Sequence, residues 1–81
     1  MTEINLQIYT IEKKLFEGEA DSLTLPGVDG ELGILPTHIP LISSLKNGSI
    51  HIRQGKDTKL IDITGGFAEI QPLSRVMVLA N

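Results

Sequence analysis

The feature that most constrains the fold is the alternation of apolar and polar residues in short runs. Near the N-terminus, Ile4, Leu6 and Ile8 alternate with polar residues, and the same two-residue period returns further along the chain. Such a period places successive side chains on opposite faces of an extended strand. Further strands are expected over residues 15–19, 21–25, 32–35, 49–53, 60–64, 67–71 and 75–80. Residues 40–45 fit either a strand or a short helical turn. Because no stretch sustains a helical period, the pattern predicts an all-β sandwich or barrel.

Turn-forming residues separate these runs. Turns are expected at residues 11–14, 54–57 and 72–74, and Asn47-Gly48 is typical of a hairpin. Gly65-Gly66 interrupts a strand, which indicates a bulge or a close approach of two backbones. The alternation sends His51 to solvent. The side chains of Phe16, Leu23 and Leu25 are expected in the core.

Residues 25–45 hold three of the four prolines and three of the eight glycines. Pro26-Gly27 and Asp29-Gly30 are typical of turns, and the proline that follows Ile39 holds Ile39 extended. We therefore expect a rigid loop that forms a docking surface, because the convergent polar groups of a catalytic pocket are missing from the pattern. The polar side chains displayed on it would be those of Asp29, Glu31, Thr37 and His38.

Composition excludes several classes of function. The 81 residues suffice for one domain, expected over residues 1–81, and the net charge of −3 includes no basic block. With scattered lysines and arginines and few aromatic residues, nucleic-acid binding is not expected. The absence of cysteine rules out disulfides and thiolate chemistry. No apolar run is long enough to span a membrane and the N-terminus is too polar for a signal peptide, so any membrane link would be indirect, through a partner.

The sequence lacks the motifs that are typical of metal-binding, phosphate-binding and hydrolytic sites. The two histidines lack metal-ligand spacing, and Gly65-Gly66 is not followed by the lysine or serine of a phosphate loop. An enzyme built on Ser43, His38 and Asp29 would need an activated serine and an oxyanion hole, which the spacing does not suggest. We expect no cofactor. A free-standing β-sandwich that binds a ligand or peptide stays open as an alternative.

Six motifs, taken together, carry a family resemblance. They are LFEGE at residues 15–19, LTLPG at 23–27, GELGILPTHIPL at 30–41, KNG at 46–48, GGFAEIQP at 65–72 and VMVLA at 76–80. In this order and spacing, they make nearly the whole chain resemble the N-terminal domain of the epsilon subunit of F-type ATP synthases. Thr37 stands where that family usually has glycine. The C-terminal helical hairpin of the family is not among the 81 residues, so we expect either a truncated chain or a naturally short subunit, and the start at Met1-Thr2-Glu3 favours the short subunit.

The resemblance implies a flattened sandwich of two roughly five-stranded, mainly antiparallel sheets. It implies a non-catalytic central-stalk subunit of a proton-translocating ATP synthase, which couples c-ring rotation to the gamma shaft for ATP synthesis. The partners would be the gamma subunit and the polar loops of the c-ring. The location would be the cytoplasmic side of the bacterial inner membrane, held there only through the complex.

The resemblance also assigns contact residues. Those expected to meet the c-ring are Glu31, Leu32, Gly33 and His38. Those expected to meet gamma are Thr10, His38, Ile39, Leu41, Ile42 and Ser43. For Ile34, Leu35 and Ile39, core and docking surface stay equally open.

Overall fold

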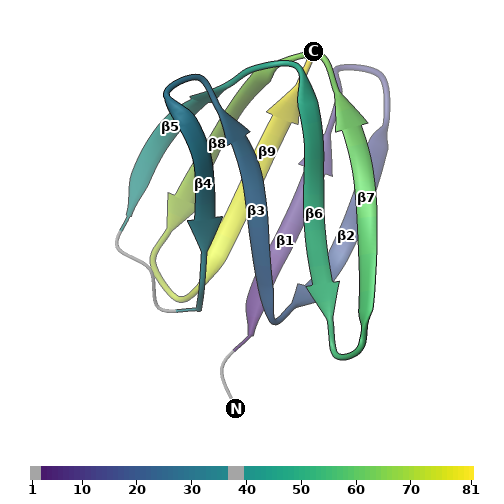
Figure 1. The fold of residues 1–81 in the computed structure, drawn as a ribbon, viewed down its shortest axis with the longest axis vertical. Helices are drawn as coiled ribbons and strands as arrows, with labels where there is room; N and C mark the ends of the chain where they lie inside the picture. Colours follow the sequence, from purple (N-terminus) through teal and green to yellow (C-terminus); the bar gives the residue numbers. More distant parts are fainter. Residues whose placement is uncertain (1–2, 37–39) are drawn as a thin grey trace.

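The computed structural model describes residues 3–36 and 40–81, and its regular elements there are all strands (Figure 1). This confirms the predicted all-β class, and residues 41–45 form a strand rather than a helical turn. The strands are β1 (Ile4–Tyr9), β2 (Lys14–Ala20), β3 (Ser22–Gly27), β4 (Gly30–Ile34), β5 (Leu41–Leu45), β6 (Gly48–Gln54), β7 (Asp57–Ile63), β8 (Gly66–Gln71) and β9 (Arg75–Ala80).

The strands form two layers that are joined at one corner. Hydrogen bonding follows the order β2-β1-β9-β8-β5-β3-β6-β7, with β4 paired to β3. The step from β5 to β3 is a single residue pair, Gly27 with Leu45, so it separates a five-stranded layer from the four-stranded layer β4-β3-β6-β7. In Figure 1 the four-stranded layer crosses in front of the five-stranded one. Apart from the parallel β1–β9 pair, neighbouring strands run antiparallel, which confirms the predicted sandwich.

The core lies between the layers and is built by the alternation read from the sequence. Ile4, Leu6 and Ile8 of β1 are fully buried, and the predicted core residues Leu23 and Leu25 are buried as well. Complete burial of one such side chain contributes about 1.5–3 kcal/mol. Phe16 was also predicted in the core but is only half-buried, because it packs at the margin with the Lys59 ammonium 5.5 Å from its ring centre.

Two of the predicted turns are wrong. Asn47-Gly48 does not close a hairpin, because β5 and β6 belong to different layers and the segment between them crosses from one to the other. Pro26-Gly27 lies within β3, and the turn consists of the next two residues, Val28 and Asp29, where Gly27 pairs with Gly30. Residues 54–57 do form the predicted turn, with Gly55 at a φ of 63°.

Of the two interpretations of Gly65-Gly66, a bulge or a close backbone approach, the structure shows the close approach. Both residues have positive φ, 140° at Gly65 and 134° at Gly66. A Cβ at Gly66 would lie 2.1 Å from the carbonyl oxygen of Leu79 in the neighbouring strand β9. Glycine is therefore required here by both conformation and space.

Candidate interaction surfaces

The β3–β4 hairpin displays an acidic corner. Asp29, Gly30 and Glu31 are exposed at its end, and the side chain of Val28 is 51% exposed beside them. The ion pair found within residues 3–36 and 40–81 joins Lys14 to Glu17, so the Glu31 carboxylate has no cationic partner there. Because the hairpin turn has only two residues, Glu31 is presented by a short, strand-supported element.

The residues predicted to meet the c-ring fall on both sides of β4. Glu31 and Gly33 are exposed, whereas Leu32 points inward and packs, half-buried, against the core. Core and docking surface were both left open for Ile34 and Leu35. Ile34 is buried and belongs to the core, whereas Leu35 is 65% exposed and lies on the surface. Thr37, His38 and Ile39, which were also predicted to lie on the docking surface or in its contacts, are outside the described residues.

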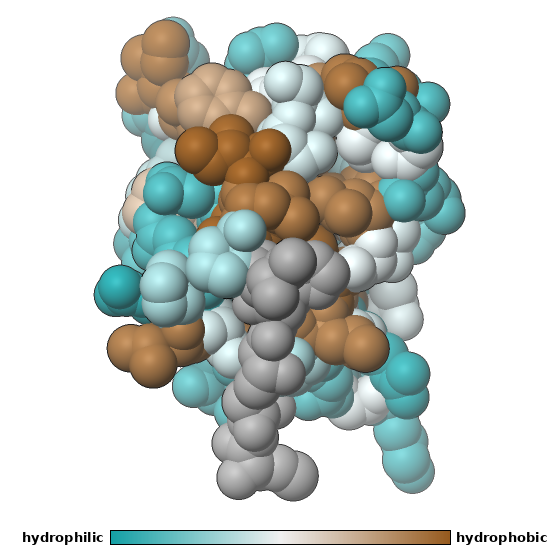
Figure 2. Space-filling model, turned by 90° about the vertical axis from the view of Figure 1, so that its left-hand side faces the viewer, coloured by the Kyte–Doolittle hydropathy of each residue, from teal (hydrophilic) through white to brown (hydrophobic). Residues whose placement is uncertain are grey.

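The second surface is the outer side of the five-stranded layer. Four apolar side chains stay exposed on β5, β8 and β9, and we call this set the outer apolar face: Ile42 (71%), Phe67 (50%), Leu79 (41%) and Met77 (39%). The strand register connects them, since Glu69 lies between Ile42 and Met77 in one row, and Phe67 pairs with Leu79 in the next. Figure 2 views the molecule from the side formed by β4 and β5, so it shows this face only edge-on; hydrophobic side chains are also gathered on the side that faces the viewer.

The residues predicted to meet gamma do not all face the same side of the layer. Ile42 projects outward from β5, but its neighbours Leu41 and Ser43 point inward and are half-buried. Thr10 belongs to the same layer and follows β1, which β9 and β8 separate from β5. Its hydroxyl oxygen accepts hydrogen bonds from the N–H groups of Glu12 (3.2 Å) and Lys13 (3.1 Å), so it shapes the β1–β2 turn.

Phe67, Met77 and Leu79 were not among the predicted contacts. A signal for two of them is present in β9, where Val76, Val78 and Ala80 are buried at alternate positions. The intervening Met77 and Leu79 are apolar too, so β9 offers hydrophobic side chains to both faces. A strand of this kind is typical of a sheet covered on both sides.

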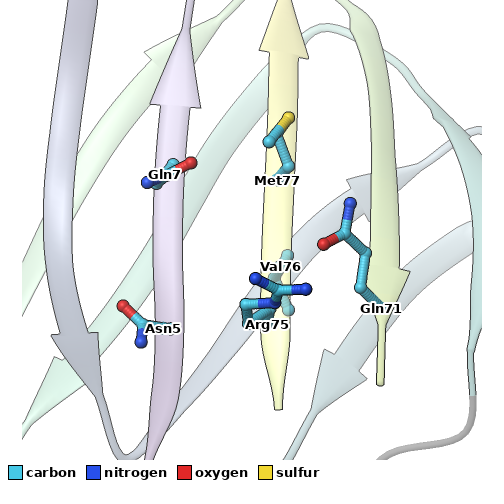
Figure 3. A pocket seen from close by; sticks show the side chains of 6 residues that line it. All are labelled: Asn5, Gln7, Gln71, Arg75, Val76 and Met77. Carbon is cyan, nitrogen blue, oxygen red and sulfur yellow. The ribbon is translucent and has the colours of Figure 1, made fainter. Parts of the chain in front are cut away.

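A shallow hollow of about 210 Å³ lies beside the outer apolar face (Figure 3). Carboxamides and the Arg75 guanidinium surround it, and Val76 points away from the viewer, toward the core. These groups can bind polar atoms, but none is a nucleophile or a general base at neutral pH. The hydroxyl of Ser43, part of the enzyme hypothesis, donates to the Ser44 carbonyl oxygen (3.4 Å). The residues lining the hollow are Asn5, Gln7, Gln71, Arg75, Val76 and Met77.

The perturbed ionisable groups lie on and beside the β1–β2 hairpin. A hydrogen bond between the Lys14 ammonium and the Glu17 carboxylate lowers the pKa of Glu17 and raises that of Lys14. The pKa of Glu3 is raised, first by its hydrogen bond with Glu19 and then by the negative charge of that residue. Histidine and acidic side chains form no cluster that could hold a metal ion in the described part of the chain.

These features define the class of protein: a β-sandwich domain with exposed acidic and apolar surfaces suited to protein contacts. Residues 3–81 match the family of the ATP synthase delta/epsilon chain, beta-sandwich domain, and the chain belongs to this family. It is 46% identical over 76 residues to the ATP synthase epsilon chain of Desulforamulus reducens, covering 94% of this chain and 57% of that one. It is 36% identical over 72 residues to the epsilon chain of Caulobacter vibrioides, covering 89% and 84%. The chain thus spans less than two thirds of the Desulforamulus relative.

The fold recurs in solved ATP synthases. A chain of the Euglena gracilis mitochondrial enzyme superposes with a TM-score of 0.91 at 21% identity, over 99% of this chain and 51% of that one. A chain from the central stalk and c-ring structure of the Tetrahymena thermophila enzyme gives 0.79 at 14% identity, over 95% and 62%. At these identities the similarity establishes the fold.

Proposed function

We propose that the chain is a non-catalytic central-stalk subunit of a proton-translocating F-type ATP synthase, coupling c-ring rotation to the gamma shaft. The observation that carries this proposal is the family match over residues 3–81, supported by relatives that are epsilon chains of ATP synthases. Two exposed surfaces on one small sandwich suit a part that connects two others. No cofactor is required for such a mechanical role.

The acidic corner is the proposed contact with the c-ring, through Glu31, Leu32, Gly33 and His38. Glu31 is exposed and has no cationic partner within the described ranges, so it is available to a basic residue of a ring loop. An exposed pair of this kind contributes about 0.2–1 kcal/mol. Glu31 would therefore fix orientation more than affinity, and the neighbouring apolar surface would supply most of the binding.

The proposed contact with gamma uses Thr10, His38, Ile39, Leu41, Ile42 and Ser43. Among those in the described ranges, Ile42 is the best candidate for an anchor, because it is 71% exposed and lies in a row with Met77. Truncating an anchor that becomes buried in an interface costs about 2 kcal/mol or more. The exposed Phe67 and Leu79 extend the same apolar area.

The proposed location is the cytoplasmic side of the bacterial inner membrane. The described ranges contain no helix long and apolar enough to cross a bilayer. Membrane association would come from the c-ring, to which the acidic corner would bind.

The c-ring contact is tested with Glu31→Lys, using Asp57→Lys as the control because Asp57 is an exposed acid on the β6–β7 hairpin. Both variants change the charge equally. We expect Glu31→Lys to weaken co-sedimentation with the purified c-ring about 3- to 30-fold, since repulsion replaces attraction. Equal ring binding by both variants would reject the role of Glu31.

The gamma contact is tested with Ile42→Ala, using Leu60→Ala as the control because Leu60 is 58% exposed on β7. The dissociation constant for purified gamma should rise about 30-fold for Ile42→Ala, the equivalent of roughly 2 kcal/mol, and stay unchanged for Leu60→Ala. A wild-type chain that stays monomeric and binds neither gamma nor ring would instead favour a free-standing binding module.

A further inference from the structure

We propose that the outer edge of β4 binds an extended polypeptide segment by backbone pairing, which adds a fifth strand to the four-stranded layer. The proposal rests on the proposed function only for the partner: a c-ring loop would supply the segment, because Glu31 and Gly33 belong to the proposed c-ring contact. It assigns Glu31 and Gly33 a second role, through their backbone groups. The segment it predicts carries a basic residue opposite Glu31 and a large side chain opposite Gly33.

Bonds on the other side of β3 show which backbone groups of β4 face outward. The N–H of Lys46 donates to the Pro26 carbonyl oxygen (2.8 Å), and the N–H of Val28 donates to the Ser44 carbonyl oxygen (3.0 Å). The backbone groups of Pro26 therefore face β5. Because these groups alternate in direction along a strand, those of Leu25 and Gly27 face β4.

The antiparallel register carries this alternation over to β4. Leu32 and Gly30 pair with Leu25 and Gly27, so their N–H and C=O groups are used within the hairpin. Glu31 and Gly33 pair with Pro26 and Thr24 and must direct their N–H and C=O groups away from β3. Among the described residues no other strand pairs with β4, so two donors and two acceptors face the open edge.

This edge carries no bulge, proline or lysine that would block an added strand. Exposed edges are commonly blocked by a bulge, a proline or a lysine. The β3–β4 register is unbroken from Leu23–Ile34 to Gly27–Gly30, and Gly30–Ile34 contains neither proline nor lysine. The proline of the hairpin, Pro26, is on β3, where its missing N–H would face β5.

Gly33 provides an independent reason to expect a neighbour. Its φ is not positive, and a Cβ built on it would meet no atom within 4 Å, so this conformation does not require glycine. A glycine inside a strand costs roughly 0.5–1 kcal/mol relative to alanine. An added strand would make use of the space, because a large side chain can lie across an edge glycine. Glu31 and Gly33 share a face, so the two matching residues of the segment are two positions apart.

The test uses the full chain with its purified c-ring and, as the comparison, with its purified gamma subunit. Amide hydrogen exchange is measured by NMR at Glu31, Leu32 and Gly33. In the complex with the c-ring, exchange at Glu31 and Gly33 should slow at least about 100-fold, as for amides that enter a stable ladder. Leu32 is the internal control, because its amide is already bonded to β3 in the free chain.

Gly33→Pro and Gly33→Ala separate backbone pairing from side-chain contact. Proline removes the outward donor and alanine keeps it, so Gly33→Pro should reduce binding at least 10-fold more than Gly33→Ala does. Thr58→Pro on β7 is the control for the general effect of a proline that removes an outward-facing amide from an edge strand. Thr58 pairs with Arg53, whose carbonyl oxygen accepts from the Asp21 N–H (2.8 Å) on the side away from β7, so the Thr58 amide also faces outward.

The outcomes distinguish this inference from the proposed function. Binding of the c-ring with unchanged exchange at Glu31 and Gly33 would overturn the inference alone, even if Gly33→Pro failed to fold. Binding of neither subunit would overturn both. Protection of the two amides in a dimer of the free chain would replace the proposed partner with a second copy.

Discussion

At the scale of single residues, Gly66 should be the glycine that tolerates substitution least. Gly66→Ala places a Cβ 2.1 Å from the Leu79 carbonyl oxygen in a backbone with a φ of 134°. We expect a loss of at least about 2 kcal/mol in the free energy of unfolding by urea. Gly33→Ala is the matched control and should change stability by no more than about 1 kcal/mol, in the stabilising direction. Equal stability of the two variants would contradict this account of Gly66.

Leu73 offers a stabilising substitution. It lies in the β8–β9 turn with a φ of 64° and its side chain is 88% exposed. A non-glycine residue there costs about 1–2 kcal/mol, part of which glycine gives back through the larger entropy of the unfolded chain. Leu73→Gly should therefore raise the free energy of unfolding by about 0.5 kcal/mol. A lower urea midpoint for this variant would show that the backbone at Leu73 is not strained.

At the scale of elements, the start of β1 and the end of β2 carry a pH-dependent repulsion. The raised pKa of Glu3 means that the folded state binds its proton more tightly than the unfolded chain does. This group therefore contributes stability below its unfolded pKa, and the contribution is lost as pH rises through the folded pKa. Glu19→Gln should raise the urea midpoint at pH 7 by a small amount, and the gain should vanish in acid where Glu3 is protonated. A gain of equal size at both pH values would show that charge is not the cause.

The Lys14–Glu17 pair makes stability depend on pH in the opposite direction. The lowered pKa of Glu17 contributes stability above its unfolded pKa, and this is lost as pH falls through the folded pKa. Lys14→Met should therefore lower the urea midpoint slightly at pH 7 and leave it unchanged once Glu17 is protonated. Because both side chains are about half exposed (48% and 49%), added salt should weaken the effect. A midpoint that Lys14→Met leaves unchanged in low salt at pH 7 would contradict the pair's contribution.

Local chemistry predicted the strands better than their connections. The alternation of Ile4, Leu6 and Ile8 determines which face of β1 is buried, whatever the partner strand. The hairpin predicted at Asn47-Gly48 was wrong because a turn signal does not reveal whether the next strand pairs with the previous one or joins another layer. The turn predicted at Pro26-Gly27 was wrong because a proline is acceptable in a strand when no ladder hydrogen bond needs its nitrogen. Whether such a bond is needed depends on the neighbouring strands.

At the scale of the whole molecule, the fold class and the family followed from the sequence, but the surfaces followed only in part. The exposed Glu31 could be anticipated from its place beside a turn. The outer apolar face could not, because Ile42, Phe67 and Met77 come together only through the β5–β8–β9 pairing. The free edge of β4 likewise depends on strand order, which residue patterns do not specify.

The most direct test of the central claim is proton-driven ATP synthesis by ATP synthase vesicles prepared without this chain and then supplied with it. We expect synthesis to be low without the chain, because shaft and ring slip, and to return when the wild-type chain is added. A variant that combines Glu31→Lys and Ile42→Ala should restore much less. Full synthesis in vesicles that lack the chain would contradict the proposed coupling role.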